Sequence, residues 1–267
     1  DKVSSINDFI ATLISELEPL QNAKADNDPA IINYIRVGDK AGVSKVNAEI
    51  RDQNSDDGIL RTGFNDINAM TQGGIRRGET VFIYGLQHKF KTGFTLSLFR
   101  QLCKLNTPYM KDPTKKPAMV RISFEDPMSN NLQTLYSFSI YNKEKRVVGK
   151  EEASSLSDEE LHRVINAELE GTGYTVFMAQ VDPTQWTYRD IVNTVLKLEA
   201  DGYEIHALMV DYLLKLPTTG CIQSGPIGSD KRDMVRRMRN FCGAKKIAFI
   251  SPHQISTEAK NLLRQGI

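Results

Sequence analysis

The sequence predicts an α/β protein in which helices flank a mainly parallel sheet. Short runs of apolar, β-branched and aromatic residues alternate with longer stretches whose apolar residues recur at helical spacing, and this alternation is typical of parallel sheets. The first such run, 81–84, stops at Gly85, and a stretch with helical spacing begins at Thr92. We expect the other strands to assemble around this unit of strand, loop and helix.

Further strands are expected after this unit, with helices between them. The strand-like stretches are 118–124, 174–180, 205–211 and 247–256. The polar stretch 142–157 is expected to be a surface loop, with Ser157 capping the helix that follows it.

The chain before residue 58 differs in composition from the rest. It is polar and shows no strand pattern, but apolar residues recur at helical spacing in 10–17 and 43–50. The stretch NSDDG (54–58) is typical of a loop. We therefore predict an N-terminal helical linker, 1–57, and an α/β domain, 58–267. The linker helices either pack on their own domain or dock on a neighbouring subunit.

Composition narrows the function only slightly. The 34 basic residues balance 33 acidic ones, so any basic surface must be local. The three cysteines are far apart and lack the spacing of metal ligands, which favours a reducing compartment. No apolar run approaches the roughly 20 residues that cross a bilayer. We expect a cytoplasmic protein without a membrane partner, and the lack of an initiating Met suggests a fragment.

The loop after the first strand has the spacing of a phosphate-binding loop. Its sequence, GLQHKFKT, matches G-x-x-x-x-G-K-[ST] except at the second glycine, where Phe90 stands. Such a loop points backbone N–H groups at phosphate from the N-terminus of a helix. Lys91 is expected to reach the outer phosphates of ATP, and Thr92 to hold Mg²⁺. The predicted nucleotide-binding residues are Gly85, Leu86, Gln87, His88, Lys89, Phe90, Lys91, Thr92 and Gly93.

Alternatives remain open at this loop. Lys89 competes with Lys91 for the phosphates, although only Lys91 is followed at once by Thr. The loop could also be a basic strand-to-helix turn that binds no nucleotide. Phe90 is compatible with a nucleotide if its ring points away from it, because a second glycine normally lets the backbone come close.

Two later strands end in carboxylates. Glu125 follows the strand at 118–124, and Asp211 ends the strand at 205–211. Ligands of open α/β sheets bind at the carboxyl ends of the strands. There Glu125 could polarise the attacking water and Asp211 could hold Mg²⁺. Asp126 is the alternative base, and solvated strand-end acids are the simpler interpretation.

The chain from about residue 61 to 256 resembles the RecA-like domain of DnaB-family replicative helicases. Its entry carries Thr62-Gly63-Phe64, a glycine pair at 73–74 and Gly78-Glu79, while Asn68 departs from the family's Asp. The resemblance places the family's catalytic Glu at Glu125 and its VDYL pattern at 210–213. The family's phosphate-sensing Gln matches Gln254, with His253 as the alternative. The resemblance therefore implies a RecA-like P-loop domain, incomplete at its C-terminus, with Lys91, Glu125 and Gln254 catalytic.

A basic cluster follows a loop rich in glycine and small polar residues at 218–230. In the family, loops at this place track the DNA backbone, and phosphate binding needs several charges close together. A solvated helix face or a subunit contact would have the same composition. The candidate DNA-binding residues are Lys231, Arg232, Arg236 and Arg237.

The resemblance implies an ATP- and Mg²⁺-dependent, ring-forming helicase of phage type in the host cytoplasm. Its expected partners are single-stranded DNA, further copies of itself in a hexameric ring, and a primase or helicase loader. A Phe at the second loop glycine also occurs in the recombinase UvsX, so a RecA/RadA/UvsX-type strand-exchange ATPase is the main alternative. A KaiC-like nucleotide-dependent switch is the third.

Overall fold

The computed structural model describes residues 38–86, 90–223 and 225–255, with only the backbone described for 52–54. The chain divides into two compact units, 1–55 and 56–267. Helix α2 (Lys40–Asn54) belongs to the first unit and confirms the helix expected around 43–50. The helix expected at 10–17 lies outside the described residues.

The second unit is built on a parallel sheet, as the sequence predicts. Its strand order is β1-β5-β4-β2-β3, and every neighbouring pair runs parallel. The strands are β1 (Thr80–Gly85), β2 (Lys116–Ser123), β3 (Thr175–Gln180), β4 (Tyr203–Asp211) and β5 (Ala248–Gln254).

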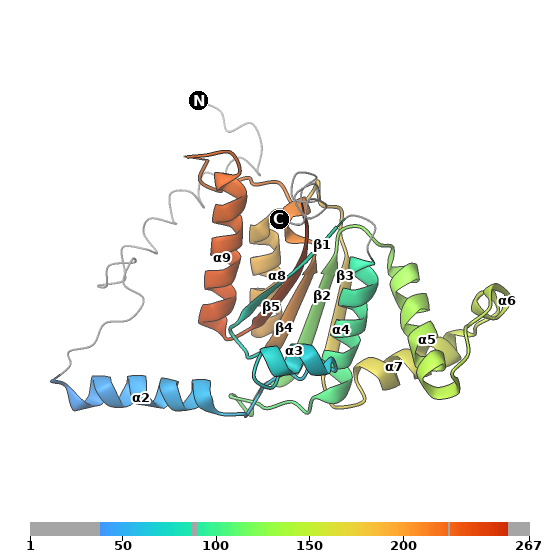
Figure 1. The fold of residues 1–267 in the computed structure, drawn as a ribbon, viewed down its shortest axis with the longest axis horizontal. Coiled ribbons are helices and arrows are strands. Elements are labelled where there is room, and N and C mark those ends of the chain that lie inside the picture. Colours follow the sequence, from blue (N-terminus) through green and yellow to red (C-terminus); the bar gives the residue numbers. More distant parts are fainter. Residues whose placement is uncertain (1–37, 87–89, 224, 256–267) are drawn as a thin grey trace. The chain divides into compact units, whose positions relative to one another are not determined.

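Helices cover both faces of this sheet (Figure 1). Helix α4 packs with α5 and α7 on one face, and α8 and α9 cover the other. None of the helices among the described residues is both long and apolar enough to cross a membrane. The helices of this unit are α3 (Asn65–Met70), α4 (Lys91–Leu105), α5 (Met128–Glu144), α6 (Lys150–Ser154), α7 (Asp158–Leu169), α8 (Tyr188–Ala200), the 3-10 turn η1 (Leu213–Lys215) and α9 (Ser229–Lys245).

Alternation along each strand divides the core into two layers. In β4, Ala207 and Met209 belong to the layer beneath α4, whereas Leu208 and Val210 belong to the layer beneath α8 and α9. Successive side chains of a strand point to opposite faces, so a strand buried on both faces is apolar throughout. Asp211 therefore falls on the same face as Met209 and α4.

The stretch 142–157 was predicted as a loop, and this prediction is wrong in part. Helix α5 continues to Glu144 and the short helix α6 occupies 150–154. Arg146 joins the two helices, because its guanidinium forms ion pairs with Glu144 and Glu152, each at 2.6 Å. The pairing partners are charged residues, which a sequence pattern alone assigns to solvent. The predicted cap of α7 is confirmed, since Ser157 Oγ accepts from Glu160 N at 3.2 Å.

Asn68 fulfils a structural role at the entry to the domain. Its Oδ1 accepts hydrogen bonds from the backbone N–H and the hydroxyl of Thr62, at 2.9 and 2.7 Å. A side-chain amide oxygen accepts as a carboxylate oxygen would. The departure from the family's Asp therefore leaves this contact in place.

Candidate nucleotide-binding site

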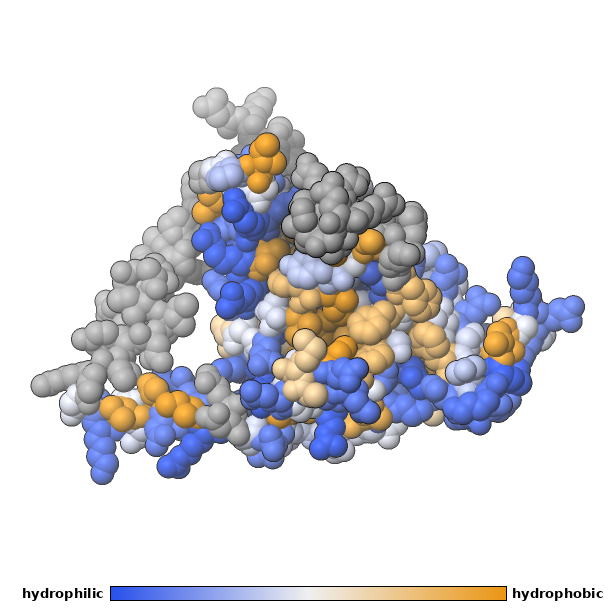
Figure 2. All heavy atoms as spheres, viewed as in Figure 1, coloured by the Kyte–Doolittle hydropathy of each residue, from blue (hydrophilic) through white to orange (hydrophobic). Residues whose placement is uncertain are grey.

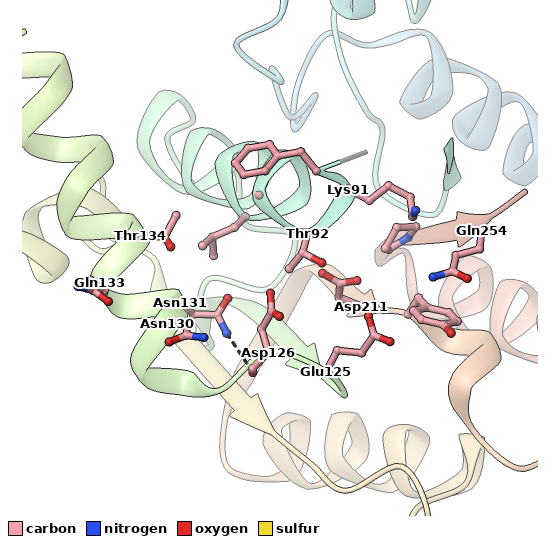
Figure 3. A pocket seen from close by; sticks show the side chains of 15 residues that line it. Lys91, Thr92, Glu125, Asp126, Asn130, Asn131, Gln133, Thr134, Asp211 and Gln254 are labelled. Atoms are coloured by element: carbon pink, nitrogen blue, oxygen red, sulfur yellow. Dashed lines mark hydrogen bonds between the residues drawn. The ribbon is translucent and has the colours of Figure 1, made fainter. Parts of the chain in front are cut away.

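A pocket of about 520 Å³ opens at the carboxyl end of the sheet. The start of α4, the ends of β4 and β5, the segment after β2 and the first turns of α5 form its walls. Figure 3 shows Thr92, Asp126 and Asp211 pointing toward one another in this pocket. The predicted site residues that line it are Phe90, Lys91, Thr92, Gly93, Glu125, Asp126, Asp211 and Gln254.

The phosphate loop is described at both of its ends. Lys91 Nζ donates to the carbonyl oxygen of Leu86 at 2.6 Å, so the side chain lies along the loop. A Cβ added to Gly85 would lie 3.1 Å from Cγ and Cδ of Lys91. Glycine at position 85 thus leaves room for the lysine stem. Gln87, His88 and Lys89 lie outside the described residues, so the choice between Lys91 and Lys89 stays a prediction.

Phe90 takes the backbone conformation that glycine adopts without strain. Its φ is 55°, in the left-handed region, which costs a residue with a Cβ about 1–2 kcal/mol. The ring lies against Gly93, since a Cβ on Gly93 would come within 2.1 Å of it. The chain therefore combines an unusual Phe in the loop with a glycine in the first turn of α4 that accommodates the ring.

Asp211 is held from two sides at the end of β4. It is 3 % exposed, and its Oδ2 accepts hydrogen bonds from Thr95 Oγ1 and from Arg121 Nη2, each at 3.0 Å. Thr95 lies one turn after Thr92 on α4. The strand end and the phosphate-loop helix are thus directly linked at the predicted metal site.

The two candidate bases have different surroundings. Glu125 forms an ion pair with Lys215 of η1, and both side chains are about one-third exposed, at 36 and 34 %. Burial and the nearby carboxylate of Asp211 raise the pKa of Asp126. Because both acids line the pocket, the structure leaves the choice between them open.

Gln254 and His253 point to opposite faces of β5. Gln254 lines the pocket, where Figure 3 shows its amide directed inward. His253 is 5 % exposed and packs against Phe82 and Tyr84, with ring centroids 4.6 and 5.5 Å apart. Only Gln254 has access to the pocket that a phosphate sensor needs.

The candidate DNA-binding residues divide into two pairs on α9. Arg236 and Arg237 form ion pairs with Asp233 at 2.5 and 2.7 Å, and Asp233 Oδ2 also accepts from the backbone N–H of Ile222 at 2.9 Å. Side-chain hydrogen bonds, led by that from Arg237, hold the pKa of Asp233 well below its usual range. This pair therefore ties the preceding loop to the helix.

Lys231 and Arg232 form the other pair, in the first turn of α9, and both are exposed. Figure 2 shows hydrophilic residues gathered over this helix. All four candidates lie away from the nucleotide pocket, whose lining comes from other elements.

Sequence reasoning missed several residues of the site. Thr95 and Arg121 contact Asp211, and Lys215 contacts Glu125. For Arg121 a signal was available, because a charged residue in the middle of a run such as AMVRISF is unusual in a strand buried on both faces. Helix α5 adds polar pocket residues that no motif marked: Asn130, Asn131, Gln133 and Thr134.

The parallel sheet and the loop at the start of α4, with acids at the ends of neighbouring strands, define a RecA-like P-loop domain. The family model of divergent DnaB-like ATPases matches residues 5–267, so the chain belongs to this family. No curated protein sequence matches the chain.

Two solved structures share the fold at 16 % sequence identity. One is a DnaB-like replicative helicase described with its interactions with primase, with a TM-score of 0.57 over 96 % of this chain and 55 % of that one. The chain thus spans about half the length of that helicase. The other is the ATPase domain of a phage gene 40 protein, with a TM-score of 0.59 over 83 % of this chain and 72 % of that one. These matches confirm the predicted RecA-like fold and the family.

Proposed function

We propose that this chain is the ATP-hydrolysing part of a ring-forming replicative DNA helicase of DnaB type. One observation carries the proposal: a single pocket brings together Lys91, Thr92, Glu125 and Asp211 from three separate segments. These residues supply the cation, hydroxyl and carboxylates that phosphoryl transfer to water requires.

Each residue has a role that its position supports. Lys91 binds the outer phosphates of ATP, because it stands at the N-terminus of α4. The oxygens of Thr92 and Asp211 suit Mg²⁺, which prefers hydroxyl, carboxylate and phosphate ligands. When bound, Mg²⁺ would neutralise charge that develops on the phosphates. Glu125, or Asp126 as the alternative, takes the proton from water, and Gln254 reads the outer phosphate.

Single-stranded DNA and further copies of the chain are the proposed partners. The related helicase is described with primase, and we extend such a partner, or a loader, to this chain. The exposed cations Lys231 and Arg232 are suited to the DNA backbone. Arg236 and Arg237 are proposed to act both on DNA and on the loop that Asp233 holds.

The proposal is tested by ATP hydrolysis with and without single-stranded DNA. We expect hydrolysis that DNA stimulates, loss of turnover in Lys91→Ala, and near-normal turnover in the neighbouring control Lys89→Ala. Loss of ATP binding in Lys89→Ala alone would show that the loop is aligned wrongly. No hydrolysis under any condition would contradict the enzyme assignment.

Two rival functions give different results. A RecA/RadA/UvsX-type recombinase would hydrolyse ATP on DNA without unwinding a forked duplex. A KaiC-like switch is favoured by the ion pair between Lys215 and Glu125, since a base held by a lysine hydrolyses slowly. Unwinding of a fork supports the helicase, and binding with very slow turnover supports the switch.

A further inference from the structure

Arg121 is a buried cation directly behind the predicted metal site. It lies in β2 between β3 and β4, and its side chain is 1 % exposed. Its Nη2 donates to Asp211 Oδ2 at 3.0 Å and its Nη1 to Met209 Sδ at 2.9 Å. This arginine is therefore enclosed on the face of the sheet that α4 covers.

The surroundings of Arg121 give it little compensation apart from one carboxylate. A thioether is a weak acceptor, and among the described residues its buried Nε has no hydrogen-bond partner. Burying a cation under such conditions is costly, and an apolar side chain of similar volume often stabilises a core as well or better. Fold stability alone therefore gives a poor account of an arginine at this position.

Its geometry relative to Asp211 indicates a role at the site. Within the described part of the chain, Arg121 and Thr95 both reach Oδ2 of Asp211 and neither reaches Oδ1. Asp211 lines the pocket, whereas Arg121 is not part of the lining. The arginine thus holds the carboxylate from behind and leaves one oxygen for the pocket.

We propose that Arg121 is a positioning residue that orients Asp211 and balances its charge, so that a divalent cation binds well only together with a nucleotide. The inference rests on the proposed nucleotide site. Two cations on opposite sides of one carboxylate repel each other, and a buried setting screens this repulsion weakly. The phosphates of a nucleotide add the negative charge that a metal alone lacks.

The test measures Mn²⁺ binding to the nucleotide-free protein by electron paramagnetic resonance. Wild type is expected to bind Mn²⁺ weakly, and Arg121→Met to bind it at least about tenfold more tightly, the change that about 1.4 kcal/mol produces. Arg121→Gln keeps a donor for Asp211 but has no charge, so it should bind as tightly as Arg121→Met. Arg121→Lys keeps the charge and should resemble wild type.

Controls separate this role from a structural one. Met209→Leu removes the sulfur contact but keeps the arginine, so its Mn²⁺ affinity should equal that of wild type. Circular dichroism establishes that each variant is folded. Folded Arg121→Met and Arg121→Gln proteins with unchanged Mn²⁺ affinity would overturn the proposal, because a purely structural arginine affects stability and not metal affinity.

A measurement on wild type keeps the proposal testable if these variants do not fold. Adding ADP should tighten Mn²⁺ binding at least about tenfold. Equal affinity with and without ADP would overturn the proposal. Mn²⁺ binding requires no turnover, so a change in affinity supports this inference even in a protein that fails to hydrolyse ATP.

Discussion

Lys215 forms an ion pair with Glu125, and it thereby joins the predicted base to the turn that follows the predicted metal site. Lys215 ends η1, and the glycine-containing segment 217–228 comes directly after it. A base that is paired with an ammonium group is less able to accept a proton from water. Release of this lysine would therefore activate Glu125.

We expect Lys215→Ala to raise ATP hydrolysis without DNA by about two- to fivefold, because exposed ion pairs are worth at most about 1 kcal/mol. The stimulation by DNA should shrink accordingly. A steady-state assay with and without single-stranded DNA measures both effects. Lys245→Ala is the matched control, since Lys245 forms a partly exposed ion pair with Glu199 away from the pocket. A fall in basal hydrolysis would show that Lys215 assists the reaction.

Glu125→Gln and Asp211→Asn should differ in stability as well as in activity. Both variants are expected to hydrolyse ATP poorly, but Glu125→Gln should still bind ATP and Mg²⁺ because Glu125 is proposed only to activate water. Asp211→Asn leaves the buried Arg121 without its carboxylate, which costs about 3–5 kcal/mol when a buried pair is broken. Thermal unfolding beside a Mg²⁺ titration measures the contrast. Near-normal hydrolysis in both variants would remove the assignment of the active site.

The strands, the phosphate loop and the two strand-end acids could be predicted because each is a local pattern. Val81 and Ile83 alternate with Phe82 within a few residues, and Lys91 follows Gly85 at a fixed interval. The contacts of Asp211 could not be predicted in this way. They depend on β2 pairing beside β4 and on α4 lying above both, which no short stretch of sequence specifies.

The basic helix shows the same limit. Sequence indicated four cations in one cluster, but Asp233 neutralises two of them. We therefore expect Lys231→Ala combined with Arg232→Ala to weaken single-strand binding without affecting stability. The slope of log affinity against log salt should fall by about 1.4, at about 0.7 for each lost phosphate contact. Binding titrations at several salt concentrations measure it.

The pair Arg236 and Arg237 should behave differently. Replacing both with Ala is expected to weaken DNA binding and also to lower the unfolding temperature, because the buried Asp233 loses two ion pairs. Lys143→Ala with Lys145→Ala is the matched control, since both lysines are exposed at the end of α5. A salt slope that no α9 variant changes would assign the basic helix to solvent or to a subunit contact.

His206 is expected to make stability depend on pH. Burial, assisted by the charge of Arg77, lowers the pKa of His206 to about 4, and Tyr174 OH lies 3.2 Å from its Nδ1. In the unfolded chain the pKa is about 6.5, so between these two values the unfolded state binds more protons. Stability is therefore complete above about pH 6.5 and falls by on the order of 3 kcal/mol as the pH drops toward 4.

Urea unfolding at pH 7 and pH 5 measures this effect. His206→Gln should unfold at more similar urea concentrations at the two pH values than wild type does. His162→Gln changes an exposed histidine of α7 and should behave as wild type. An equal loss of stability on acidification in wild type and His206→Gln would assign the pH dependence to other groups.

The last prediction concerns assembly. The pocket holds a phosphate loop, Glu125 and Asp211, and no motif of the chain identifies an arginine that stabilises charge on the transferred phosphate. A neighbouring subunit supplies such an arginine in related ring ATPases, and it is worth about 10³ to 10⁵ in rate. We therefore expect specific ATPase activity to rise with protein concentration.

The segment 1–57 is expected to promote this assembly. Val43 and Ile50 of α2 are 41 and 48 % exposed, and an apolar helix face is suited to a partner surface. A protein that begins at residue 58 should form smaller assemblies and lose activity at low concentration, while nucleotide binding persists. Light scattering beside an ATPase titration measures both. If the whole chain is monomeric and its specific activity is independent of concentration, the ring mechanism is excluded, and the nucleotide switch becomes the better account of the pocket.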